Sequence, residues 1–101
     1  MNMQQIVQQM TKMQRLYEKE HKQIEDKEYE FVANGVVKVV LKGNYELVSI
    51  EFIDKDAVKE DPEMVEDMIK IAYNGCKEQI ESDEQALADK FKKTAGGGMM
   101  F

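Results

Sequence analysis

Apolar residues in the first quarter of the chain recur at alternating spacings of three and four residues. This stripe consists of Met3, Ile6, Met10, Met13, Tyr17 and Ile24. Such spacing places its members on one face of an amphipathic helix. Glu20 occupies the one slot of the stripe that lacks an apolar residue. The pattern predicts a helix from Asn2 to about Asp26, with a seam like that of a coiled coil over about three heptads.

The hydrophobic period then changes to two, which is typical of strands. Two short turn signals, Asn34-Gly35 and Gly43-Asn44, divide this region. Asn-Gly favours the type I′ turn of a tight hairpin. The predicted strands are residues 28–33, 36–42 and 45–53. Together they predict a three-stranded antiparallel meander.

A second helix is predicted from Pro62 to about Lys93. Asp61 suits the N-cap, Pro62 the first helical position, and Glu63 the positive first turn. Its apolar stripe consists of Val65, Ile69, Ala72, Cys76, Ile80, Leu87 and Phe91. The stripe keeps its phase through Asn74-Gly75, so we expect one continuous helix weakened there by about 1 kcal/mol. The preceding segment, residues 54–60, is predicted to be a loop or a short turn of helix.

The predicted fold class is therefore α+β, with the order helix, three strands, long helix (α-β-β-β-α). We expect one domain over residues 1–93 and a flexible tail rich in Gly and Met over residues 94–101. The helices would measure roughly 35 and 45 Å, whereas the strands would span only about 20 to 30 Å. The helices thus overhang their sheet with apolar stripes exposed, which predicts a homodimer.

Composition excludes several function classes. One Cys and one His cannot form a disulfide framework within the chain or a closed zinc site from Cys and His alone. No nucleophile has a partner that spacing identifies, so we predict no catalytic, cofactor-binding or metal-binding residues and no small-molecule substrate. His21 is interpreted as a surface or packing residue. Cys76 is interpreted as a buried inert thiol, with a redox switch at a dimer interface as the alternative.

The absence of a long apolar run predicts a soluble, cytoplasmic protein without a membrane span. The acidic cluster near the middle of the chain lacks the residue order of an EF-hand loop. We therefore interpret these residues as solvated surface carboxylates and helix caps. It consists of Asp54, Asp56, Glu60, Asp61, Glu63, Glu66 and Asp67.

The net charge of −6 opposes nucleic-acid binding when it is taken over the whole chain. The charge is unevenly distributed, however. Residues 1–24 have four cations against two carboxylates, and residues 85–101 have three cations against one. The excess of acid lies in residues 25–84. Both ends of the chain are therefore basic.

The four cations of the first helix share one face. Lys12, Arg15, Lys19 and Lys22 fall within an arc of roughly 80° that lies nearly opposite the apolar stripe, and Gln4 and Gln8 extend the same line. Such a row suits contact with the phosphates of a duplex. It also fits the solvated face of an ordinary helix, which is the simpler interpretation from these residues alone.

Several segments in order resemble a known family. They are residues 37–43 (VKVVLKG), 48–54 (VSIEFID), 61–69 (DPEMVEDMI) and 72–74 (AYN). Together with the first helix rich in Gln and Met and the Gly-Met-Phe end, this series resembles the YbaB/EbfC family of bacterial nucleoid-associated proteins. The sequence departs from the family pattern at Gly75 and Cys76 and in its acidity.

The resemblance implies a tweezer-like homodimer that binds duplex DNA through its two terminal helices, with a role in nucleoid organisation or gene regulation. It also implies that the protein has no enzymatic activity. The expected DNA-binding residues are Gln4, Gln8, Lys12, Arg15, Lys19, Lys22, Lys90, Lys92 and Lys93. Arg15 is the only Arg, so bidentate readout of guanine is minimal and we predict low sequence specificity. Glutamines near the N-terminus leave some preference for adenine open.

Two other functions compete with DNA binding. The acidic middle and the helix grooves would suit a protein-interaction adaptor that recruits basic or amphipathic partners without DNA. A first helix lying on membranes is the weaker alternative, because its basic charge is modest and its seam is needed for packing.

Overall fold

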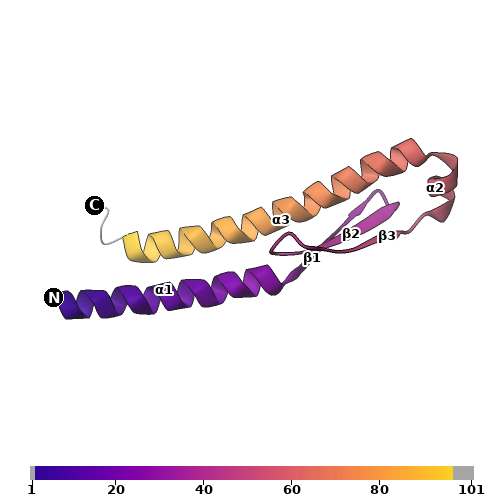
Figure 1. The fold of residues 1–101 in the computed structure, drawn as a ribbon. Coiled ribbons are helices and arrows are strands. Elements are labelled where there is room, and N and C mark those ends of the chain that lie inside the picture. The colour runs from indigo at the N-terminus through magenta and orange to yellow at the C-terminus, as the bar shows by residue number, and fades with distance from the viewer. Residues whose placement is uncertain (1, 97–101) are drawn as a thin grey trace.

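The computed structural model describes residues 2–96 and confirms the predicted order of elements (Figure 1). Its elements are α1 (Met3–Asp26), β1 (Glu28–Ala33), β2 (Val37–Lys42), β3 (Leu47–Phe52), α2 (Lys55–Glu60) and α3 (Pro62–Gly96). Of the two options for residues 54–60, the short helix is present. Helix α3 is continuous through Asn74-Gly75, as predicted, and runs three residues past Lys93 into the segment predicted to be a tail. Residues 97–101 of that segment lie outside the described residues.

Both long helices begin at side-chain caps. The Asn2 side chain accepts a hydrogen bond from the Gln5 N–H at 2.8 Å, and Asp61 Oδ1 accepts one from the Met64 N–H at 3.2 Å. Each satisfies a backbone donor that the first turn of a helix leaves without a partner. The capping role predicted for Asp61 is therefore confirmed.

The sheet has the order β1-β2-β3, and both pairs are antiparallel. Asn34 and Gly35 have φ values of 48° and 70°, as a type I′ turn requires. In the second turn the positive φ falls on Tyr45, at 71°, and the Asn44 side chain accepts a hydrogen bond from the Glu46 N–H. This turn is longer than the Gly43-Asn44 pair predicts, so β3 begins at Leu47.

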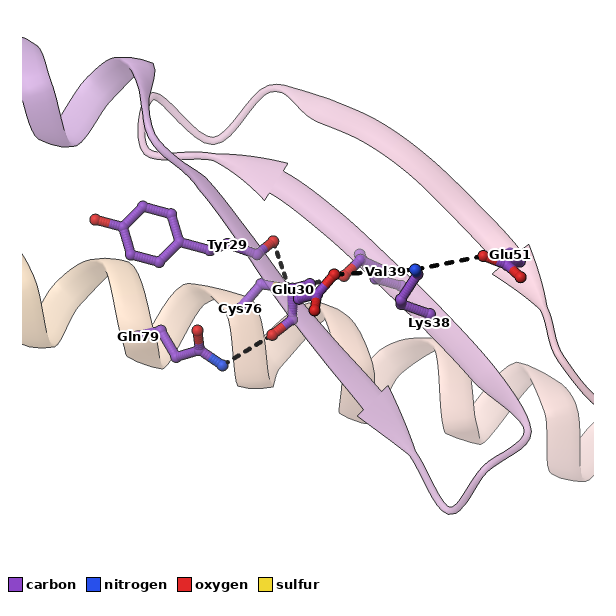
Figure 2. Close-up of polar contacts among 7 residues, drawn as sticks. All are labelled: Tyr29, Glu30, Lys38, Val39, Glu51, Cys76 and Gln79. Atoms are coloured by element: carbon purple, nitrogen blue, oxygen red, sulfur yellow. Dashed lines mark hydrogen bonds and ion pairs between the residues drawn. The ribbon is translucent and has the colours of Figure 1, made fainter.

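Helix α3 packs across β1 and β2 and forms the core with them. The largest fully buried side chains are Val37, Val39, Leu41, Cys76 and Ile80. Polar contacts fix the same interface, as Figure 2 shows: the Cys76 thiol donates to the Val39 carbonyl at 3.2 Å, and the Gln79 amide donates to the Glu30 carbonyl at 3.0 Å. On the opposite face of the sheet, Lys38 lies between Glu30 and Glu51.

Two glycines permit close approaches. A Cβ atom on Gly75 would overlap the ring of Phe31, which packs against the core. A Cβ atom on Gly43 would overlap the backbone carbonyl of Ile24. Gly75 therefore allows α3 to pack closely on β1, and Gly43 allows the end of α1 to pack closely on the turn between β2 and β3.

The molecule is elongated, with extents of 69 × 24 × 14 Å (Figure 1). Helices α1 and α3 run side by side in opposite directions and extend well beyond the sheet. The radius of gyration of 19.8 Å exceeds the value of about 13 Å for a compact domain of this length. The predicted overhang of the helices is thus confirmed.

Candidate nucleic-acid interface

The predicted row of cations lies on the outward face of α1. Gln4, Gln8, Lys12, Arg15, Lys19 and Lys22 are all exposed. Several of them line a shallow groove along the helix together with Val7, Thr11 and Leu16. The side of α1 that faces α3 carries Tyr17, Glu20 and His21 instead. Six of the nine predicted contact residues therefore share one solvent-facing surface, which we call the α1 row.

The cations of the α1 row differ in their partners. Among residues 2–96, Lys12, Arg15 and Lys19 form no ion pair with another side chain. Lys22 lies 3.5 Å from Asp26 on the same helix, and both groups are more than half exposed. An exposed pair of this kind is worth little, so a phosphate competes easily for Lys22.

The three predicted lysines of α3 are arranged differently. Lys90 donates a hydrogen bond from Nζ to Glu20 Oε1 at 2.6 Å across the two helices. Lys92 is exposed. Lys93 lies on α3, but its side chain is outside the described atoms. The structure therefore places Lys90 at the interface between α1 and α3 and not in the α1 row.

Aromatic and ionic contacts join α1 to α3 near Lys90. Tyr17 meets Phe91 edge to face, with ring centroids 5.4 Å apart, and stacks on His21. The His21 imidazole nitrogens lie 3.9 Å from Glu25 and 3.8 Å from Glu84. His21 is thus a packing residue at the helix interface, as the sequence predicts.

A second cluster, absent from the sequence predictions, lies at the base of α1. Asp83 Oδ2 accepts hydrogen bonds from the Tyr29 hydroxyl at 2.7 Å and from Lys27 Nζ at 3.1 Å, and Lys27 Nζ lies 4.8 Å from the centre of the Tyr29 ring. The Lys27 carbonyl also accepts a hydrogen bond from the Gly43 N–H at 2.9 Å. We call Lys27, Tyr29 and Asp83 the base cluster. It ties the end of α1 to both α3 and the sheet.

Burial and hydrogen bonding shift the pKa values within the base cluster. Burial, reinforced by the hydrogen bond to Asp83, raises the pKa of Tyr29 far above its ordinary value of 10.0. The hydrogen bond from Tyr29, together with the nearby Lys27 ammonium, lowers the pKa of Asp83 below 3.8. The neutral phenol and the ionised carboxylate therefore stabilise each other at neutral pH.

Two carboxylates of the acidic cluster have a structural role. Asp54 and Asp61 cap α2 and α3, and each accepts a backbone hydrogen bond. Within residues 2–96 no group of three or more His, Cys, Asp or Glu side chains is arranged to hold a metal ion. No helix in that range is long and apolar enough to cross a membrane.

A large apolar surface lies where α3 does not cover the sheet. Leu47, Ile50 and Phe52 pair with Leu41, Val39 and Val37, so they project from the same face as these core residues. They are nevertheless 51%, 40% and 39% exposed. Every residue of β3 is exposed, which is unusual for so apolar a strand. We call this surface the β3 face.

The molecule is thus an elongated α+β protein with a basic outer helix face, an acidic body and an uncovered apolar sheet face. Comparison with known proteins identifies its family. Residues 1–99 match the model of the YbaB/EbfC DNA-binding family. The chain belongs to this family.

Two relatives share nearly the whole chain. A nucleoid-associated protein of Hyphomonas neptunium is 41% identical over 99 residues, covering 95% of this chain and 89% of its own length. A nucleoid-associated protein of Malacoplasma penetrans is 36% identical, and the match covers both chains in full. Among solved structures, an uncharacterised protein of Helicobacter pylori matches with a TM-score of 0.73 at 22% identity, over 89% of this chain and 96% of that chain. This last likeness concerns the fold alone.

Proposed function

We propose that the protein binds duplex DNA as a homodimer, with low sequence specificity, through the α1 row. The observation that carries this proposal is the set of three cations, Lys12, Arg15 and Lys19, which line up on an exposed helix face without carboxylate partners among the described residues. Membership of a DNA-binding family supports DNA as the ligand of the α1 row. We further infer that the protein acts at the bacterial nucleoid, in DNA organisation or gene regulation, as a binding protein without catalytic activity.

The dimensions of the row fit a phosphate backbone. Lys12 and Lys22 are ten residues apart, or about 15 Å along the helix axis. That length corresponds to the rise of about four base pairs. Two copies of Lys12, Arg15 and Lys19 would release about six counterions, which predicts a slope near −5 for log affinity against log salt concentration.

Low specificity follows from the chemistry of the row. Lysine contacts phosphate as a point charge, whereas arginine and amides read base edges with paired hydrogen bonds. Only Arg15, Gln4 and Gln8 in the row offer that second kind of contact. Affinity should therefore come mainly from the backbone of the duplex.

The β3 face supports the homodimer. The chain exposes 7447 Å² of surface, against roughly 5,900 Å² for a compact monomer of its mass. The excess is larger than the approximately 800 Å² that each partner loses in a standard interface. A second copy covering Leu47, Ile50 and Phe52 would bury the most apolar part of this excess surface. The dimer would then carry two α1 rows.

Fluorescence anisotropy with a labelled duplex tests DNA binding against a matched control. Replacing Lys12, Arg15 and Lys19 together with Gln should abolish binding at about 100 mM salt. The control replaces three exposed lysines of the acidic body with Gln, which changes net charge equally. These are Lys55, Lys59 and Lys70. Equal loss in both variants would show that net charge, and not the α1 row, governs binding.

A further inference from the structure

The ion pair between Lys90 and Glu20 joins α3 to α1. At 2.6 Å, the bond from Lys90 Nζ to Glu20 Oε1 has the length of a strong charge-assisted hydrogen bond. The same ammonium group lies 5.8 Å from the centre of the Phe91 ring, which in turn contacts Tyr17 of α1. Lys90 is therefore engaged with the α1 side of the interface.

The position of Glu20 explains why this pair forms. Glu20 fills the one slot of the α1 stripe without an apolar residue, and its side chain is only 32% exposed. A carboxylate held between two helices is costly unless a donor or a cation meets it. Lys90 supplies both, and this requirement exists whether or not DNA is present.

The pair is also well placed to set the direction of α1. The base cluster holds α1 at Lys27, and Glu20 lies seven residues, or about 10 Å, farther along the helix. Separated points of attachment define a direction, whereas one point permits tilting. The Tyr17–Phe91 ring contact and the His21–Glu84 approach lie in the same stretch as the Glu20–Lys90 pair and add to this second attachment. The α1 row from Lys19 toward the N-terminus lies beyond both ion pairs, with Lys12 about 22 Å from Lys27.

A small tilt would therefore move the row appreciably. A rotation of about 10° about Lys27 displaces Lys12 by about 4 Å, which exceeds the rise of one base pair. The cations would then lose their alignment with successive phosphates.

We propose that Lys90 is a positioning residue that acts through Glu20. It holds α1 at a fixed angle to α3, and it does not itself bind phosphate. This inference rests on the proposed DNA binding through the α1 row, and it reassigns one residue that the sequence places among the phosphate contacts.

Four variants test the proposal in a salt titration against one duplex. Lys90→Met and Glu20→Leu each break the pair, and the double variant replaces it with an apolar contact that continues the α1 seam. Each single variant should weaken DNA binding about fivefold at fixed salt, the factor expected from an ion pair of roughly 1 kcal/mol. The double variant should bind within twofold of the parent although it has no cation at this position. Lys19→Gln, within the α1 row, is the fourth variant.

The salt slope separates positioning from direct contact. Lys90→Met should leave the slope unchanged, whereas Lys19→Gln should reduce its magnitude by about 0.9 per protomer. A reduced slope for Lys90→Met, or a double variant as weak as Lys90→Met alone, would overturn the positioning role. An unchanged slope for Lys19→Gln would instead contradict the proposed DNA interface.

Hydrogen exchange without DNA gives an independent readout. Both single variants should speed amide exchange in residues 12–20 of α1, and the double variant should restore protection. Unchanged exchange in both single variants would refute the attachment itself. Circular dichroism at the assay temperature confirms that each variant is folded, so a loss of affinity reports the direction of α1.

Discussion

Gly75→Ala offers a test of how α3 is seated on the sheet, because two effects of opposite sign meet at this position. Within a helix, Ala is favoured over Gly by about 1 kcal/mol. In this structure, however, the added Cβ would overlap the Phe31 ring. Overpacking of this kind costs about 1–3 kcal/mol, so we expect a net loss of about 1 kcal/mol in the free energy of unfolding.

Removal of the ring should reverse the sign. In a Phe31→Ala background the overlap is gone, and Gly75→Ala should raise the free energy of unfolding by about 1 kcal/mol. Urea denaturation followed by circular dichroism measures both effects, at one protomer concentration because the proposed dimerisation would contribute to stability. A stabilising effect of Gly75→Ala in the parent protein, or the same effect in both backgrounds, would refute the reasoning.

Three further predictions concern the β3 face, the base cluster and the thiol. Ile50→Glu places a charge on the β3 face and should convert the proposed dimer to a folded monomer. Light scattering after gel filtration measures the mass, and a dimer of unchanged size would exclude this face as the interface. The lowered pKa of Asp83 contributes stability that is present above pH 4 and is lost as the pH falls through its folded pKa. The raised pKa of Tyr29 contributes stability that is present below pH 10 and is lost as the pH rises further, so Tyr29→Phe should flatten the alkaline limb of a plot of unfolding free energy against pH. Cys76 is fully buried and its pKa is raised by burial, so a thiol reagent should modify it only at the rate of unfolding, and rapid modification of the folded protein would contradict its packing.

The elements that the sequence predicts correctly depend on short-range signals. Asn34-Gly35 requires positive φ at both turn residues, and Asp61-Pro62 caps and begins a helix, so each can be recognised from its neighbours alone. The α1 row is of the same kind, because the spacing of residues on one helix fixes the face on which they lie.

What the sequence does not predict depends on contacts between distant residues. Tyr29 and Asp83 are 54 residues apart, and Glu20 and Lys90 are 70 apart, so no local spacing pairs them. The need for glycine at position 43 comes from the approach of the Ile24 carbonyl, again from another element. The exposure of β3 likewise reflects where α3 lies across the sheet. The prediction of Lys90 as a phosphate contact takes no account of its partner Glu20 on the other helix.

The measurement closest to the central claim is a salt titration of duplex binding between about 50 and 200 mM salt. With the α1 row of a dimer on the phosphates, log affinity should fall with log salt at a slope near −5, and the same duplex length with a different sequence should give nearly the same curve. Absence of binding at low salt, or binding indifferent to salt, would contradict the account. Partner proteins retained in a nuclease-treated lysate would then favour the adaptor function.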